Sequence, residues 1–318
     1  MAGPDTRLSH NDLVELRPPR EILATLDEHG ALDKIPFMPE MLNFYGQRLA
    51  VARRAYIVCI YEPGTPLGFA ADDVVTLHET RCSGVAHGGC QKQCTILWRE
   101  AWLRKVEGTA EHSTADLLDL DALKARLKVM TDPKTYFCQA SEIKRATHSL
   151  SKAERLRRMG GALEAGYLTV PVMLRNLATW FLWRLRLLFF GRSPRGQDSP
   201  FAGESLNLQP GEWVEVRPLP EIAKTLDTSS HNRGLRFNPE MAHLAGKRLR
   251  VRTRLDKLIV DGTGQMRQMR NTVSLEGSTC GCAYVGFGMD GCARCELTYW
   301  REGWLRRVDS ANESRSGS

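Results

Sequence analysis

The sequence lacks the signatures of several common enzyme and secreted-protein classes. It contains no glycine-rich nucleotide loop, no recognisable Ser-His-Asp order and no His-Glu-x-x-His helix. No apolar run follows the first positive charge in MAGPDTRLSHND, so the pattern of a secretory signal peptide is missing. We therefore expect a cytoplasmic protein, and whether it is an enzyme stays open.

A long apolar run free of charge is also missing. The stretch 170–191 approaches the length of a bilayer span but contains Arg175, Arg184 and Arg186. An arginine near the bilayer centre costs roughly 2.5–3.5 kcal/mol on insertion scales. We therefore expect no transmembrane span here. A helix of this composition either packs between folded modules, which we favour, or lies in a membrane interface.

Acidic residues are scarce in the middle of the chain. Residues 143–195 hold eleven Lys or Arg and two acids, a local charge of +9 in a chain of net charge +7. This excess predicts an acidic partner, which would be a protein, a nucleic acid or an anionic membrane surface. A solvated helix face is the alternative. The candidate contacts are Arg155, Arg157 and Arg158.

The sequence does contain an internal repeat. Residues 12–51 match residues 212–251 without a gap, and seventeen of the forty positions are identical. WREAWLRKV (98–106) likewise matches WREGWLRRV (300–308) at seven of nine positions. The chain is therefore predicted to hold two copies of one module. We place the modules at 11–107 and 211–309, a basic helical connector at 108–197, a linker at 198–210 and a disordered tail at 310–318.

Each module is predicted to be small and mainly β. Residues 14–17 alternate like a strand, and residues 20–27 place apolar side chains at helical spacing. Residues 248–277 alternate polar with apolar around Asp-Gly-Thr-Gly (261–264), which predicts a hairpin followed by a third strand. Short strands around a small core favour an SH3-like barrel. The expected fold class is α+β, with two such barrels in tandem joined by a helical connector.

The connector is predicted to be helical at two places. Residues 117–130 have helical periodicity and good helix formers. Residues 150–190 have the same character, and we expect interruptions at Gly160-Gly161 and at Pro171.

The cysteines are odd in number and clustered. Nine are present, and in a reducing cytosol clustered thiols are more often metal ligands or reactive groups than disulfides. Both clusters lie between the last hairpin strand and the tryptophan motif. The first contains Cys82, His87, Cys90 and Cys94, and the second contains Cys280, Cys282, Cys292 and Cys295.

Two kinds of metal centre fit these residue types. Zinc takes four nitrogen or sulfur ligands, and each cluster supplies four. An iron–sulfur cluster also takes four cysteines, often three close together and one remote. Cys138 would then be the remote ligand for Cys82, Cys90 and Cys94. Buried free thiols are the third interpretation, and it is the one expected for Cys59 in the apolar run YIVCIY.

The repeated tryptophan motif has two interpretations. Its tryptophans converge on one face of a strand or a helix. They would close the core of each module, which we favour, or form an aromatic and basic surface for a ligand or nucleic acid. The residues concerned are Trp98, Trp102, Trp300 and Trp304.

One pair of acids recurs in equivalent Pro-Glu-Met turns. Glu40 and Glu240 would act as general acids or as metal-binding oxygens. An acid near a helix start more often caps that helix or pairs with an arginine, and we favour this interpretation.

Together these motifs resemble one known group. The pattern VEVR…EI..TLD…F.PEM…G.R..V, with a cysteine cluster and WRE.WLRRV, resembles an uncharacterised bacterial family with two copies of a cysteine-containing SH3-like module. That family is associated with biosynthetic gene neighbourhoods. The resemblance covers both modules and YFCQASE (136–142), which implies a role for Cys138 beside the first cluster. It brings no activity with it.

Three functions are consistent with these observations. The leading hypothesis is a zinc-binding tandem-module scaffold or binding protein, accessory to a biosynthetic pathway. The alternative is an iron–sulfur redox protein or enzyme that uses Cys82, Cys90, Cys94 and Cys138. The third is a nucleic-acid or membrane-surface binder that acts through the basic connector.

Overall fold

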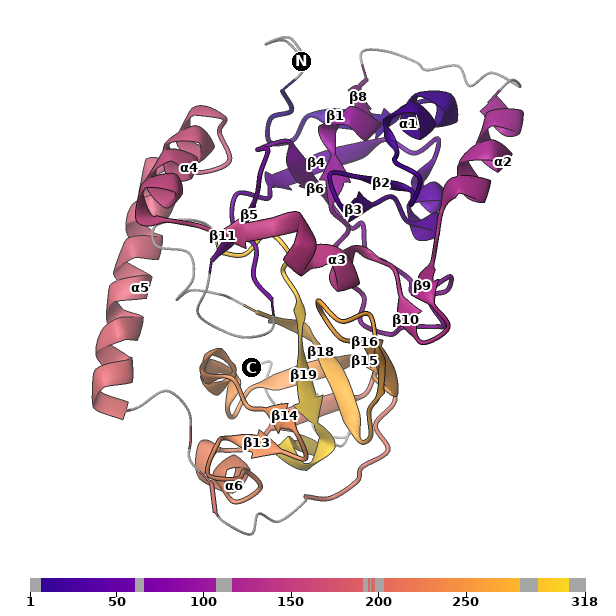
Figure 1. Ribbon diagram of the computed structural model, residues 1–318. Helices are drawn as coiled ribbons and strands as arrows, with labels where there is room; N and C mark the ends of the chain where they lie inside the picture. Colours follow the sequence, from indigo (N-terminus) through magenta and orange to yellow (C-terminus); the bar gives the residue numbers. More distant parts are fainter. Residues whose placement is uncertain are drawn as a thin grey trace, which may run out of the picture. The chain divides into compact units, whose positions relative to one another are not determined.

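The fold combines small antiparallel sheets with a few helices (Figure 1). The computed structural model describes residues 7–60, 66–106, 116–190, 194, 196–197, 203–280 and 291–308. Cys282 and the tail expected at 310–318 lie outside these ranges. The mixed α/β class is the one expected from the sequence. No helix among the described residues has both the length and the apolar character that a membrane span requires.

Two compact units make up the chain, and neither is continuous in sequence. Within the described residues, the first unit holds the chain up to Trp180 together with Ile259–Arg267 and 291–295. The second unit holds the remainder. Two segments of the second sequence repeat therefore fold into the unit that contains the first repeat. The boundaries of the units thus differ from the module boundaries drawn at 107 and 211.

A five-stranded antiparallel sheet forms the centre of the first unit. The strand predicted at residues 14–17 is present as β1 (Leu13–Leu16), but its burial does not alternate, because Val14, Glu15 and Leu16 are all buried. Val14 pairs with Leu49 on one side and with Lys105 on the other. The strands, in spatial order, are β7 (Trp98–Arg99), β6 (Val74–Leu77), β4 (Leu49–Arg54), β1 (Leu13–Leu16) and β8 (Leu103–Lys105).

Short helices and two-stranded ribbons surround this sheet. The hairpin turn predicted at residues 261–264 is present, and it belongs to the first unit. It packs on α3 (Gln139–Ala146) and β10 (Thr135–Tyr136), because Gly262 N–H donates to Ala140 O (2.9 Å) and Tyr136 N–H donates to Gly264 O (2.8 Å). The elements are α1 (Pro19–Thr25), β2 (Ala31–Leu32), β3 (Ile35–Pro36), η2 (Pro39–Phe44), β5 (Leu67–Phe69), η3 (Glu100–Trp102), α2 (Asp116–Arg126), β9 (Met130–Asp132), β10 (Thr135–Tyr136), α3 (Gln139–Ala146), β11 (Thr147–Ser149) and α4 (Lys152–Glu164). The hairpin strands β16 (Lys257–Ile259) and β17 (Met266–Gln268) each have residues in both units, and the turn between them belongs to the first.

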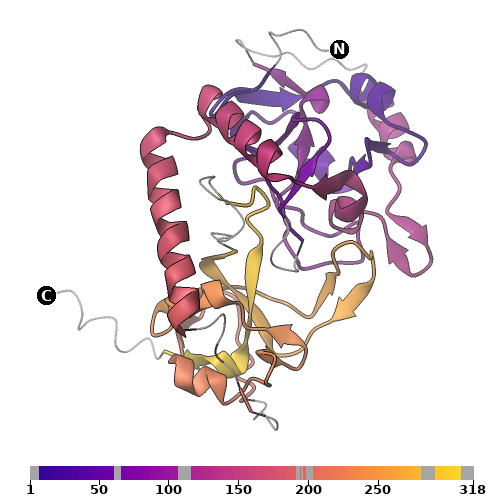
Figure 2. The same ribbon diagram turned by 60° about the vertical axis from the view of Figure 1, so that its left-hand side comes forward.

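The predicted break at Gly160-Gly161 is wrong. Helix α4 (Lys152–Glu164) runs through both glycines. A capping box stabilises its first turn: Glu154 N–H donates to Ser151 Oγ (3.2 Å), and Ser151 N–H donates back to the Glu154 carboxylate (2.8 Å). The chain leaves the helix at residue 165. Helix α5 (Val170–Phe190) then starts with Pro171 in its first turn, where a proline needs no N–H partner. It is a long, straight helix in both views (Figures 1 and 2).

The second unit contains a sheet with the corresponding strand order. Four of its five strands, all but β18 (Thr272–Thr279), include residues of the segments that align with strands of the first sheet. In spatial order they are β19 (Leu297–Arg301), β18 (Thr272–Thr279), β15 (Arg248–Arg254), β12 (Trp213–Val216) and β20 (Leu305–Arg307), and the unit also holds α6 (Leu219–Ala223), β13 (His231–Asn232), β14 (Leu235–Arg236), η4 (Pro239–Leu244) and η5 (Glu302–Trp304).

Tryptophans fill the core of each unit. Trp98 and Trp102 are fully buried and pack edge-on against Phe44 and Phe37, with ring centroids 5.9 Å and 5.2 Å apart. Their indole N–H groups donate to the hydroxyls of threonines, which satisfies the one polar atom of each ring. In the second unit Trp300 and Trp304 are equally buried and pack against Phe237.

Candidate metal centre

A pocket in the first unit brings together most of the predicted ligands. Cys82, Cys90 and Cys94 reach it from the loop between β6 and β7, and Cys138 reaches it from the residue before α3. The first cluster and its expected remote cysteine therefore line one pocket. Its other lining residues are Met38, His87, Lys92, Gln93, Gln139, Ala140 and Ile259.

The loop that carries three of these cysteines closes on itself through glycine. Gly84 has φ +69°, and its carbonyl accepts hydrogen bonds from the N–H groups of His87, Gly89 and Cys90. A side chain on Gly84 would overlap the carbonyl of Cys90. The ends of the loop meet because Cys82 N–H donates to Cys94 O (2.8 Å). Glycine at this position is therefore what turns the cysteines toward one side.

Burial disfavours the thiolate form of two of these cysteines, Cys138 and Cys82. It raises the pKa of Cys138 to about 11, although N–H groups of Ser141 and Ala140 at the start of α3 pull in the opposite direction. Burial also raises the pKa of Cys82 far above its usual range, and the charge of Glu40 adds to this rise. A metal ion binds the thiolate form, so binding would release protons from these groups.

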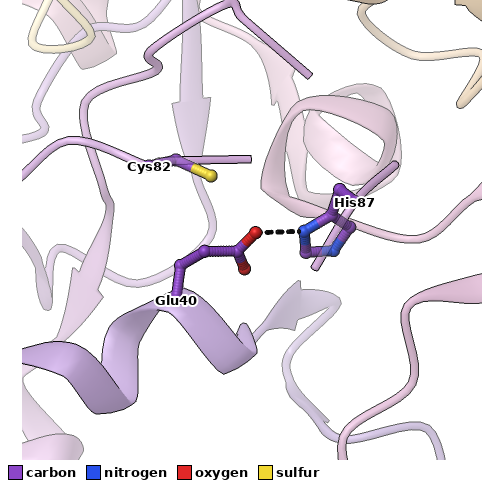
Figure 3. A group of neighbouring side chains, drawn as sticks. All are labelled: Glu40, Cys82 and His87. Atoms are coloured by element: carbon purple, nitrogen blue, oxygen red, sulfur yellow. Dashed lines mark hydrogen bonds and ion pairs between the residues drawn. The ribbon is translucent and has the colours of Figure 1, made fainter. Parts of the chain in front are cut away.

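An acid–histidine pair lies beside the cysteines. Glu40 projects from η2 between Cys82 and His87 (Figure 3), and the three donor atoms lie within 4.8 Å of one another. Glu40 Oε1 is 2.8 Å from His87 Nδ1, and Phe137 O is 3.1 Å from His87 Nε2. Burial raises the pKa of Glu40, but the hydrogen bond and charge of His87 outweigh it and the net pKa is lowered. Both ring nitrogens thus face oxygen acceptors.

This arrangement limits His87 as a ligand. A histidine binds a metal through a deprotonated ring nitrogen. Here both ring nitrogens already have an oxygen partner, Glu40 Oε1 for Nδ1 and Phe137 O for Nε2. His87 would have to give up either Glu40 or Phe137 O before it could bind an ion.

The sulfur atoms are spread around the pocket. Among the residues that the structure describes, the one group of three donors within 4.8 Å is Glu40, Cys82 and His87. No three of the four cysteine sulfurs are that close. In a tetrahedral zinc site, bonds of 2.3 Å place the sulfurs about 3.8 Å apart. The four-cysteine set is therefore wider than a single zinc ion needs.

Segments of the second repeat complete the surroundings of the pocket. Ile259 N–H donates to Cys90 Sγ at 3.3 Å, a contact of the kind that tunes a metal-bound thiolate. Asp261 is buried between two cations: Lys92 donates to it, and Arg294 does so through both terminal nitrogens, at 3.0 and 3.2 Å. These ion pairs hold the segments 259–267 and 291–295 within the first unit.

The second predicted cysteine set is divided. Cys280 belongs to the second unit, where its sulfur lies 3.7 Å from Glu240 Oε1. Cys292 and Cys295 belong to the first unit, and Cys282 lies outside the described residues. Cys292 Sγ lies 3.4 Å from the sulfur of Cys59. The expectation that Cys59 is a plain core residue therefore missed its contact with a second thiol.

The four tryptophans lie in the cores of the units, as favoured from the sequence, and one of the three candidate arginines is buried. Trp98, Trp102, Trp300 and Trp304 are all 0% exposed, so they cannot stack on a ligand or a nucleic acid base. Arg158 is 2% exposed and donates to the carbonyls of Tyr56 and Phe69. Of the three arginines proposed for a partner, Arg157 is exposed and Arg155 is half-buried.

Sequence reasoning underestimated Glu40. Its recurrence as Glu240 was visible, and in each copy this glutamate lies near the first cysteine of the cluster. Glu40 Oε2 is buried and has no hydrogen-bond partner. Helix capping, the favoured interpretation, does not account for such an atom.

Comparison of the chain with family models, with curated proteins and with solved structures gave no match.

Proposed function

We propose that the protein is an iron–sulfur protein whose cluster is held by Cys82, Cys90, Cys94 and Cys138. The observation that supports this most is the convergence of these four thiols on one pocket. Cys138 follows Cys94 by forty-four residues, so no local turn brings them together. Three ligands from one loop and one remote ligand is a common arrangement for such clusters.

The spacing of the sulfurs favours a cluster over one zinc ion. Several iron and sulfide ions occupy more space than one metal ion, and the four thiols are too widely spread for a compact tetrahedron. A cluster would supply one-electron redox chemistry. The chain would exclude water through its buried residues, direct the N–H of Ile259 at one ligand and place the cation of Lys92 in the lining.

Elemental analysis tests this proposal directly. Protein purified without air is expected to be brown and to contain iron and acid-labile sulfide. The variant C138S is expected to lose most of both, because it removes the remote ligand. C280S, in the second unit, serves as the matched control and is expected to keep them. Colourless wild-type protein without iron, even after reconstitution with iron and sulfide, would contradict the proposal.

A zinc-stabilised scaffold is the second candidate function. The group of Glu40, Cys82 and His87 favours it, because oxygen, sulfur and nitrogen donors within 4.8 Å suit zinc. The variant E40Q separates the two candidates. It would lower the zinc content of a zinc protein and leave the iron content of a four-cysteine cluster unchanged.

We also propose that each unit contains an SH3-like barrel and that the protein works as a tandem module in the cytoplasm. The corresponding strand order of the two five-stranded sheets supports the first point. Buried thiols, which a reducing compartment preserves, support the second. An experimental structure in which either sheet stays open would contradict the barrel assignment.

A further inference from the structure

Two cysteines far apart in the sequence lie in contact inside the first unit. The sulfur atoms of Cys59 and Cys292 are 3.4 Å apart, and these residues are 8% and 3% exposed. Neither lines the pocket that holds the four proposed cluster ligands. Their proximity therefore calls for an explanation of its own.

The backbones on both sides of this pair are fixed. Ala293 N–H donates to Ile57 O at 2.9 Å, and the Arg294 guanidinium donates to Cys59 O at 2.7 Å. Arg294 is in turn held by the buried carboxylate of Asp261. The two segments that contain Cys59 and Cys292 are thus held side by side with the thiols facing one another. Little conformational freedom remains to be lost when the two sulfurs bond.

We propose that Cys59 and Cys292 form a reversible disulfide, which makes the pair an oxidative modification site. A disulfide bond is about 2.05 Å long. The sulfurs must therefore approach by about 1.4 Å, which small side-chain rotations supply. The bond would join the first repeat to the segment 291–295 of the second repeat. This site is independent of the proposed cluster.

Hydrogen peroxide is the oxidant class that a buried pair admits, because it is small. One thiol loses its proton and attacks a peroxide oxygen; the O–O bond breaks, and the released hydroxide takes up a proton to become water. The second thiol then attacks the sulfenic acid, its sulfur displaces the hydroxyl group, and a second water leaves. Two thiols and one peroxide thus give one disulfide and two waters, and a dithiol reductant reverses the reaction.

Peptide mapping of the full-length protein tests the proposal. The reduced protein is treated with hydrogen peroxide, its free thiols are alkylated, and it is cut with trypsin and with a protease that cleaves before aspartate. These cuts isolate Cys59 in residues 55–71 and Cys292 in residues 290–294, each without another cysteine. We expect a linked peptide pair that is absent from the untreated sample and disappears on reduction.

Thermal unfolding of the same protein provides a second measurement. The oxidised protein is expected to unfold at a higher temperature than the reduced protein. A disulfide between residues 233 positions apart restricts the unfolded chain. C59S is expected to abolish both the linked peptide and the increase, and C280S to leave both intact. Three results would each overturn the proposal. The first is that Cys59 and Cys292 are still alkylated after oxidation. The others are a disulfide from Cys292 to another cysteine, and a bound metal ion that is lost in C59S.

Discussion

Arg158 is the clearest case of a charge used inside the fold. Its guanidinium donates to Tyr56 O at 3.1 Å and to Phe69 O at 2.6 Å, and it lies 2.8 Å from Asp72. Replacement by alanine leaves two buried carbonyls without donors and opens a cavity. We expect R158A to lower the free energy of unfolding by about 3 kcal/mol, measured by urea denaturation.

The neighbouring arginine provides the control. Arg157 is exposed on the same helix, so R157A is expected to change the free energy of unfolding by less than about 0.5 kcal/mol. Equal effects of the two substitutions would show that the contacts of Arg158 contribute no stability. The sequence could not separate the two residues, because both lie in one basic run and helix packing alone decides which one points inward.

Among the cysteines, too, some positions could be predicted from the sequence and others could not. Cys82, Cys90, Cys94 and Cys138 were predicted from residue type and spacing, and the structure places them around one pocket. The contact between Cys59 and Cys292 was not predictable, because the apolar neighbours of Cys59 in sequence carry no information about a residue that far along the chain.

The loop between β6 and β7 depends on one backbone conformation. Gly84 adopts a positive φ, and its carbonyl organises the turn that contains His87 and Cys90. In G84A the new side chain would overlap Cys90 O, so the loop must open. If the pocket holds the proposed cluster, we expect G84A to lose most of its iron, measured by elemental analysis after reconstitution with iron and sulfide.

A glycine in open surroundings is the matched control. Gly160 lies inside α4, and a side chain there meets nothing within 4 Å. We expect G160A to raise the free energy of unfolding by up to about 1 kcal/mol, because alanine favours the helix, and to leave the metal content unchanged. A G84A protein with wild-type iron content would show that the turn does not position the ligands.

Local patterns predicted the elements where local chemistry decides. The turn at 261–264 and the strand at 14–17 were found because glycine and alternation specify them. The break at Gly160-Gly161 was wrong, because a strong N-terminal cap and tertiary packing override the low helix propensity of glycine. Likewise η2, with Glu40 on it, carries no local signal for its role beside the cysteines.

Over the whole molecule, the repeat predicted much of the architecture but not the composition of the units. Matching segments form corresponding strands of two sheets. Yet Ile259–Arg267 and 291–295 belong to the unit of the first repeat, which follows from contacts between residues more than a hundred positions apart. An alignment of the two copies with each other contains no information about such exchanges.

The buried ion group around Asp261 is therefore where the integrity of the first unit is best tested. Burial raises the pKa of Asp261, but Arg294 and Lys92 outweigh it and hold the net pKa below its usual range. An acid with a lowered folded-state pKa adds stability above the ordinary carboxyl pKa of about 3.9, and this stability is lost as the pH falls below that value.

D261N keeps the shape of the side chain but removes the negative charge that the buried cations Lys92 and Arg294 face. We expect a loss of about 3–5 kcal/mol at pH 7, measured by urea denaturation, and a smaller decline in stability between pH 5 and pH 3 than in the wild type. D121N, which alters an exposed pair with Lys124, is expected to change neither. D261N could instead match the stability of the wild type at pH 7 and its decline between pH 5 and pH 3. The ion group would then not be what holds the second-repeat segments in place. Their packing around Ile259 would then have to account for it.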